Sequence, residues 1–190
     1  MTRWLPPSRS RRFGAAGAFA VAMLASSVTL LSQSVTQPAL KAAFLINFAK
    51  FVEWPTDATA SGPLTLCVLD DVAVAEALGQ LINVPVNGRT MLLVKSARSH
   101  PLRGCHLLYL GDPDPARAAA TLDELKGAPI LTVGDGDGFA RGGGMIGLFV
   151  EDGRMRFAIN SDAAQRVGLR LSSKLLNLAK IVKEGRHGQL

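Results

Sequence analysis

The sequence predicts an α/β fold in layers: a mostly parallel sheet flanked by helices, with an antiparallel strand pair near the C-terminal part. Short and almost wholly apolar runs such as LTLCVLD alternate with helical patterns, as is typical of strands buried on both faces of a parallel sheet. Two later runs, residues 145–151 and 154–159, are separated only by Asp152 and Gly153, a pair that favours a tight turn between antiparallel strands.

The first expected element is a helix over residues 38–52. Its large apolar side chains recur at helical spacing: Leu40, Phe44, Phe48 and Phe51. The Trp-Pro pair at positions 54 and 55 ends the pattern. We expect this stripe to face the core, and a partner-binding face is the alternative.

The central elements continue the alternation. Strands are expected at residues 64–70, 105–110 and 130–133, and helices at residues 72–81 and 115–125. Between them, Asn87 and Gly88 predict a tight turn that joins two extended segments, residues 84–86 and 90–94.

Two helices complete the predicted fold. One covers residues 161–167, with Ser161 as its N-cap and Gly168 at its end. The other covers residues 171–182, because one apolar stripe recurs there at helical spacing: Leu171, Leu175, Leu178 and Val182. We expect the last helix to dock on the sheet through this stripe.

Residues 1–34 have the pattern of an export signal, since four arginines precede an uncharged run rich in Ala, Val and Leu. The run is also long enough to remain as a membrane anchor, so both outcomes stay open. Residues 35–190 are expected to form one domain.

The formal net charge of +6 arises from 21 basic and 15 acidic residues. Four of the basic residues and no acidic ones lie in residues 1–34, so the remaining chain has 17 against 15, or +2. No basic patch interleaved with aromatic residues replaces them, and nucleic acid is therefore not an expected partner.

The glycine-rich stretch LTVGDGDGFARGGGMIGLF fits none of the glycine motifs that bind ligands. A dinucleotide or phosphate loop must open a helix, and the glycines at positions 142–144 argue that no helix begins here. As an EF-hand loop starting at Asp135, the stretch would place Ile146 where a bidentate glutamate is needed. We interpret it as a strand end, a turn and re-entry into the sheet at Met145.

Acidic side chains gather where the predicted strands end, with Asp70 and Asp71 after one strand and Asp112 after another. Ligands of open parallel sheets bind beyond the carboxyl ends of the strands, so these three residues are candidate Mg²⁺ ligands. The pattern resembles a response-regulator receiver with Asp112 as phosphoacceptor, although no lysine closes a later strand. A small-ligand or metal-binding protein, or an enzyme that uses this crevice, is the alternative hypothesis.

Catalytic and cofactor motifs are otherwise missing from the sequence, and we expect no cofactor. The histidines are scattered at positions 100, 106 and 187, and a metal site at Cys105 and His106 would need two further ligands. No serine lies in a nucleophile elbow. The sequence therefore favours a binding protein over an enzyme.

The chain has two cysteines, Cys67 and Cys105. In an exported protein an even pair suggests a disulfide, whereas in the cytosol it would suggest two inert thiols. A bridge would close a loop of about 39 residues, which contributes about 4 kcal/mol in the chain-entropy model. That is enough for a redox-controlled change in stability.

Three blocks, taken in order, resemble the YfiR-like family of periplasmic proteins: KAAFLINFAKFVEWP, GGGMIGLFVEDGRMRFAIN and LRLSSKLLNLAKIV. The resemblance extends from about Leu40 to Val182. It implies regulation rather than catalysis, because the best-known members repress an inner-membrane diguanylate cyclase by binding its periplasmic sensory domain and so control cyclic di-GMP. Relatives also occur with sensor kinases.

The resemblance implies further properties. Cys67 and Cys105 match one family cysteine pair, which suggests redox or envelope stress as the input, whereas the second pair is absent. A partner-binding surface is expected from five residues: Phe149, Glu151, Phe157, Asn160 and Lys174. Core packing is the alternative role for the two phenylalanines, and a homodimer through residues 40–52 is also expected.

Overall fold

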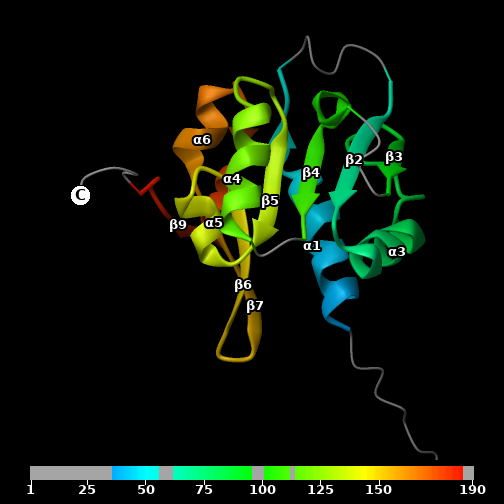
Figure 1. Ribbon diagram of the computed structural model, residues 1–190. Coiled ribbons are helices and arrows are strands. Elements are labelled where there is room, and N and C mark those ends of the chain that lie inside the picture. The colour runs from blue at the N-terminus through cyan, green and yellow to red at the C-terminus, as the bar shows by residue number, and fades with distance from the viewer. Residues whose placement is uncertain (1–35, 56–61, 96–100, 112–113, 186–190) are drawn as a thin grey trace, which may run out of the picture. The chain divides into compact units, whose positions relative to one another are not determined.

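The computed structural model describes residues 36–55, 62–95, 101–111 and 114–185. A seven-stranded sheet has the order β3-β2-β4-β5-β6-β7-β9 (Figure 1). Its strands are β2 (Leu64–Leu69), β3 (Met91–Val94), β4 (Leu107–Leu110), β5 (Leu131–Asp135), β6 (Ile146–Glu151), β7 (Arg154–Ile159) and β9 (Lys180–Ile181). Only β6 and β7 pair antiparallel; the other neighbours pair in parallel. The predicted fold class is therefore confirmed.

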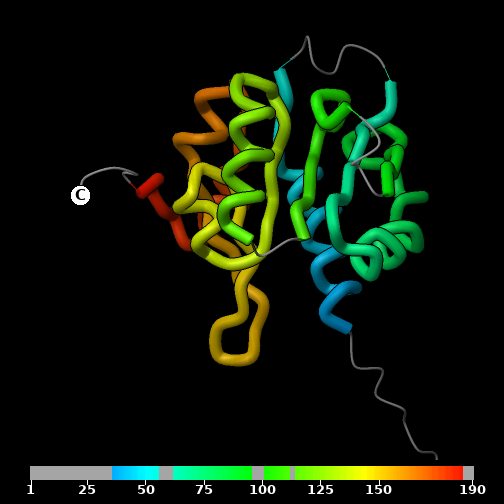
Figure 2. The backbone as a smooth tube through the Cα atoms, viewed as in Figure 1, coloured from blue at the N-terminus to red at the C-terminus, as the bar shows by residue number. Residues whose placement is uncertain are grey.

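Helices cover both faces of the sheet, and Figure 2 traces α1 and α4 on opposite sides of it. They are α1 (Gln37–Lys50), α3 (Val72–Leu81), the 3-10 turn η2 (Leu102–Gly104), α4 (Pro115–Glu124), α5 (Asp137–Arg141), α6 (Ser161–Arg166) and α7 (Ser173–Leu176). A second, antiparallel pair joins β1 (Val52–Glu53) to β8 (Arg170–Leu171). Among the described residues, no helix combines the length and apolar character that a bilayer crossing requires.

The alternation of side chains along β2 divides the core in two. Leu66 and Val68 join a large cluster that includes residues of α1, α3, α6 and α7. Cys67 and Leu69 point the other way, into a smaller cluster with Leu108 of β4 and, at its border, a residue of α4. Because both faces of the strand are buried, its sequence is apolar at nearly every position.

Helix α1 begins at a Thr36 cap, whose hydroxyl accepts the N–H of Ala39 at 3.4 Å. It ends at Lys50, two residues earlier than expected, because Val52 pairs with Leu171 in the small sheet. Of the predicted aromatic stripe, Phe48 is buried, whereas Phe51 is 37% exposed.

The predicted helix over residues 171–182 is wrong. Ser172 caps only the single helical turn of α7, and the chain then extends so that β9 joins the edge of β7. Val182 donates its N–H to Ile159 at 2.9 Å and is buried, but Leu178 is 74% exposed. Backbone pairing at the sheet edge outweighs the helical spacing of the leucines here.

The interpretation of the glycine stretch as a turn without a helix is also wrong, because α5 forms within it. Gly136 has φ +82°, a left-handed conformation that turns the chain from β5 into this helix. The ring of Phe139 lies against Gly134 and Gly144, where a Cβ atom would clash with it. Because Gly134 and Gly144 have no side chain, there is room for the ring of Phe139 between them. Re-entry into the sheet follows as expected.

The tight turn at Asn87 and Gly88 is confirmed. Val86 and Arg89 exchange two backbone hydrogen bonds of 2.9 Å across it, and both central residues have positive φ. The pairing does not extend into a longer hairpin, because Met91–Val94 instead pairs in parallel with β2 as the edge strand β3.

Candidate functional site

Polar side chains meet near the carboxyl ends of three neighbouring strands. Asp71 comes shortly after β2, Tyr109 lies in β4, and Asp135 ends β5. The chain passes from β2 to β3 on one side and from β3 back past β2 to β4 on the other side, and ligands of open α/β sheets bind at such a switch point. This edge is therefore the first candidate for a functional site.

Lys41 of α1 completes a polar cluster of four residues: Lys41, Asp71, Tyr109 and Asp135. Its Nζ donates to Oδ2 of Asp135 at 2.6 Å and to the Tyr109 hydroxyl at 3.1 Å, and lies 4.0 Å from Oδ2 of Asp71. The Tyr109 hydroxyl donates to Oδ1 of Asp135 at 3.0 Å, with Oδ2 of Asp71 3.4 Å away. One ammonium and one hydroxyl thus connect two carboxylates, one at the N-cap of α3 and one at the end of β5.

Tyr109 is fully buried, and the side chains around it are mostly buried too: Lys41 is 15%, Asp71 20% and Asp135 28% exposed. Burial raises the pKa of Tyr109 far above its ordinary value, and the charges of Asp135 and Asp71 and the hydrogen bonds to them raise it further. The hydroxyl therefore remains a protonated donor at any physiological pH.

Asp71 has a second role in the cluster. Its Oδ1 accepts the N–H of Val74 at 2.9 Å, so it is the N-cap of α3, while Oδ2 faces Tyr109. The cluster thus ties α1, α3 and two central strands together. It holds α1 against the carboxyl ends of the central strands by charge, in addition to the apolar contacts that α1 makes with the core.

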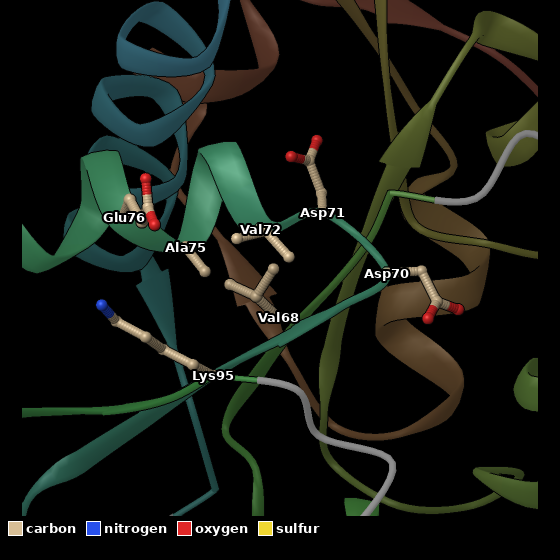
Figure 3. Close-up of a pocket in the computed structure, with 7 residues that line it drawn as sticks. All are labelled: Val68, Asp70, Asp71, Val72, Ala75, Glu76 and Lys95. Carbon is tan, nitrogen blue, oxygen red and sulfur yellow. The ribbon is translucent and has the colours of Figure 1, made fainter.

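Two of the three candidate Mg²⁺ ligands, Asp70 and Asp71, lie in the described residues, and their side chains do not converge. Asp70 has φ +61° and points away from Asp71, as Figure 3 shows. Asp112 lies outside the described residues. Within the described part of the chain, no group of three His, Cys, Asp or Glu side chains has a geometry suited to a metal ion. Lys41 provides the positive charge beside Asp71 and Asp135 instead.

A cavity of about 460 Å³ opens beside Asp71, between the ends of β2 and β3. Figure 3 shows Val68, Val72 and Ala75 in its apolar wall, with Lys95 and Glu76 at one side and Asp71 at another. An apolar wall with a few charged groups is the usual composition of a small-ligand pocket.

A second exposed feature is the hairpin of β6 and β7. Figure 1 shows it projecting beyond the rest of the sheet. The strand β5 pairs with β6 only at residues 146–148, and β9 pairs with β7 only at residues 158–159. The distal ribbon, residues 149–156, therefore has no strand neighbour on either side among the described residues.

A family model described as YfiR/HmsC-like matches residues 38–180, from the first turn of α1 to the start of β9. The chain belongs to the YfiR/HmsC-like family. This family is known for periplasmic regulators of cyclic di-GMP signalling, and it is regulatory rather than catalytic. The match covers both the polar cluster and the distal ribbon of this YfiR/HmsC-like domain.

Cys67 and Cys105 form a disulfide in this YfiR/HmsC-like domain, with their Cα atoms 5.9 Å apart. Both are buried, in the smaller core beneath α4. The neighbouring His106 accepts the N–H of Thr65 at Nδ1, 3.1 Å away, and so has a structural contact within the sheet.

The five residues expected at a partner surface occupy different environments. Phe157 is buried and packs its ring on Phe48, 5.1 Å between centroids. Asn160 is fully buried: its side chain accepts the N–H of Ala163 and so caps α6 in place of Ser161, and it donates to the Ala140 carbonyl.

The other three residues expected at the partner surface are exposed to solvent to different degrees. Phe149 is half-buried, with Lys180 Nζ 5.4 Å from its ring centre. Glu151 is exposed near the tip of the distal ribbon, and Lys174 is exposed on α7. Contact with a partner therefore remains a proposal for Phe149, Glu151 and Lys174.

Sequence reasoning missed Lys41 and Tyr109 as parts of the site. One signal was present: the only tyrosine of the chain stands inside the apolar strand LLYL, and a buried hydroxyl requires a hydrogen-bond partner. The identity of that partner depends on how α1 packs, which the spacing of its residues does not specify.

Proposed function

We propose that this domain is a periplasmic repressor that binds the periplasmic sensory domain of an inner-membrane diguanylate cyclase and so lowers cyclic di-GMP. The observation that carries the proposal is the family match, which spans nearly every described element. A sensor kinase is the alternative partner, because it is a signalling protein with the same kind of exposed periplasmic domain.

The polar cluster supports regulation rather than catalysis at the carboxyl edge. A carboxylate that acts as a general acid or base must be free to exchange a proton with the substrate. Here Lys41 already contacts Asp135 at 2.6 Å, and Asp71 is committed to capping α3. These groups stabilise the fold, which leaves the surface as the means of acting on another molecule.

The disulfide supports a redox input. It joins β2 to the segment before β4, so reduction removes a covalent link between two central strands. A less stable repressor releases its partner more readily, because any opening of the fold competes with binding. We propose that oxidised protein represses and that reducing or envelope stress relieves repression.

The test is retention of membrane proteins by the tagged full-length chain, exported in its host and captured with and without reductant. We expect mass spectrometry to identify a diguanylate cyclase that is retained more strongly under oxidising conditions. Deletion of the gene should raise cellular cyclic di-GMP. Absence of any cyclase or kinase in both conditions, together with unchanged cyclic di-GMP, would contradict the proposal.

A second candidate function is binding of a small molecule with an apolar body and a charged group, since the cavity beside Asp71 has that character. Under this hypothesis a ligand raises the melting temperature of the wild type but not of an Ala75→Phe variant, whose side chain fills the cavity. Glu53→Gln, on β1 and not among the residues that line the cavity, is the matched control. No shift across a broad metabolite and metal panel would exclude it.

A further inference from the structure

The distal ribbon presents unpaired backbone groups in a defined pattern. The Ile159 carbonyl accepts the N–H of Val182, so Ile159 directs its backbone groups toward β9 and away from β6. Backbone direction alternates along a strand, so Phe157 and Met155 have the same outward direction. On that side β9 extends only to residues 158–159 of β7. Met155 therefore presents an N–H and a carbonyl at an edge without a strand neighbour among the described residues.

Among the usual ways of protecting a sheet edge, this edge has only charged side chains. Proteins block exposed edges with proline, a bulge, a covering loop or charged residues. Residues 154–157 contain no proline, and their register against β6 is unbroken, with Met155 opposite Val150. Val150 is 54% exposed. An edge of unbroken register with an exposed apolar neighbour is suited to pairing with another strand.

The charges beside the edge are basic. Arg154 and Arg156 lie on one face of β7, both exposed, and Lys180 of β9 lies on the same side. Lys180 has Asp137 as a partner at 3.6 Å, whereas Arg154 faces Glu151 in the register, and Arg156 faces the uncharged Phe149. A strand added next to β7 would place its own side chains directly beside the two arginines.

We infer that the free edge of β7, residues 154–157, binds an extended segment of the partner as an added strand, with acidic residues at alternate positions facing Arg154 and Arg156. The inference rests on the proposed function and specifies the chemistry of the partner. Main-chain hydrogen bonds supply affinity in this mode of recognition, and the alternate side chains supply specificity.

A second copy of the chain does not fit the same edge. If two β7 edges pair antiparallel around a two-fold axis through Met155, Arg154 of one copy faces Arg156 of the other. If Met155 pairs with Phe157, the two Arg156 side chains face each other. Like charges directly opposite destabilise a strand pair, so the edge favours an acidic partner over self-association.

The test of the backbone contact uses three variants and the purified periplasmic domain of the cyclase that the wild-type protein retains from membranes. Met155→Pro removes the outward N–H without removing a bond to β6, which is where proline is tolerated in an edge strand. Met155→Ala shortens the same side chain but keeps the N–H. Val150→Pro blocks the opposite edge of the ribbon. Met155 packs partly against the main core, so a native circular dichroism spectrum and a cooperative melting transition, rather than an unchanged melting temperature, would show that each variant folds.

We expect Met155→Pro to weaken binding by roughly tenfold or more, since it removes a backbone bond and obstructs the edge. Met155→Ala and Val150→Pro should change the dissociation constant by less than about threefold. Charge reversal provides an independent arm that does not alter the backbone: Arg154→Glu with Arg156→Glu should also weaken binding about tenfold, while Arg154→Lys with Arg156→Lys retains most of it.

Failure of this inference is distinguishable from failure of the proposed function. If the wild type retains a cyclase and all the variants bind it equally, the β7 edge is not the contact and the inference is wrong. If the wild type retains neither a cyclase nor a kinase and cyclic di-GMP is unchanged, the proposed function fails and the inference fails with it. Sedimentation of the wild type as a dimer that Met155→Pro dissociates would identify a second copy as the occupant and also overturn the inference.

Discussion

The polar cluster and the distal ribbon differ in how fully their polar groups are satisfied. In the cluster, each of the four side chains has a partner within 4.0 Å, and the tyrosine at its centre is inaccessible to water. In the ribbon, residues 149–156 pair only with each other, and both outer edges lack strand neighbours among the described residues.

This difference distinguishes polar groups that stabilise the fold from polar groups that are available to bind a partner, within one sheet. A buried polar group stabilises a fold only when it is paired. Because the cluster is mostly buried, each of its side chains needs a partner, and each has one. Unpaired backbone at an exposed edge is solvated in the free protein and becomes available to a partner. The comparison predicts that changes in the core and its cluster act on stability, whereas changes in the ribbon act on binding.

The largest stability effect is expected from loss of the disulfide, which lies in the core and not in the distal ribbon. A Cys67→Ser, Cys105→Ser double variant should lose up to about 4 kcal/mol of unfolding free energy in urea. Wild-type protein treated with reductant should lose a similar amount of unfolding free energy. Amide exchange should accelerate in β2 and β4 but remain unchanged in the ribbon. Equal stability of oxidised and reduced protein would contradict this expectation.

A second large effect should follow Lys41→Met, which leaves two carboxylates near a buried hydroxyl without their cation. Removing one member of a mostly buried charge pair costs about 3 kcal/mol. Lys50→Met is the matched control, since Lys50 is exposed on the same helix and should change stability by less than about 0.5 kcal/mol. Equal losses in the two variants would show that the cluster does not hold α1 on the sheet.

A smaller effect concerns Tyr109 itself, the only tyrosine of the chain. Tyr109→Phe should cost about 1–2 kcal/mol at neutral pH because Lys41 and Asp135 lose a hydrogen-bond partner. The folded pKa of Tyr109 is raised, so the stability linked to its protonated form is complete below about pH 10 and declines as the pH rises further.

Ultraviolet absorbance of the phenolate measures this directly, since no other tyrosine contributes. About nine-tenths of an ordinary tyrosine is ionised at pH 11, whereas the native protein should show almost no phenolate signal there. The signal should develop together with the loss of circular dichroism. A normal titration curve in folded protein would show that Tyr109 is accessible to water and the cluster open.

The sequence predicts the strands better than it predicts the site. Apolar runs such as LLYL are sufficient to indicate strands buried on both faces, and strand-end aspartates follow from the same pattern. The meeting of Lys41 with Asp135 spans 94 positions and depends on where α1 settles on the sheet. No local pattern contains that information.

The C-terminal segment shows the converse limitation. Leucines at helical spacing predicted a helix over residues 171–182, yet only Ser173–Leu176 is helical. The edge of β7 was available to Lys180 and Ile181, and a buried place beside Ala140 and Ala158 was available to Val182. Local periodicity competes with tertiary partners that lie elsewhere in the sequence.

The smallest stability effect is expected in the ribbon, and one substitution made twice sharpens the comparison. Val150→Thr introduces a hydroxyl at a position that is 54% exposed, and should change the unfolding free energy by less than about 0.5 kcal/mol. Val133→Thr introduces the same group at a fully buried position in β5 and should cost about 1–3 kcal/mol, because the hydroxyl loses its water contacts. Urea unfolding of the two variants measures both. Phe149 and Met155 of the ribbon already pack partly against the core. If Val150→Thr proved equally costly, Val150 would have to be packed as well, and the ribbon would be less accessible to a partner.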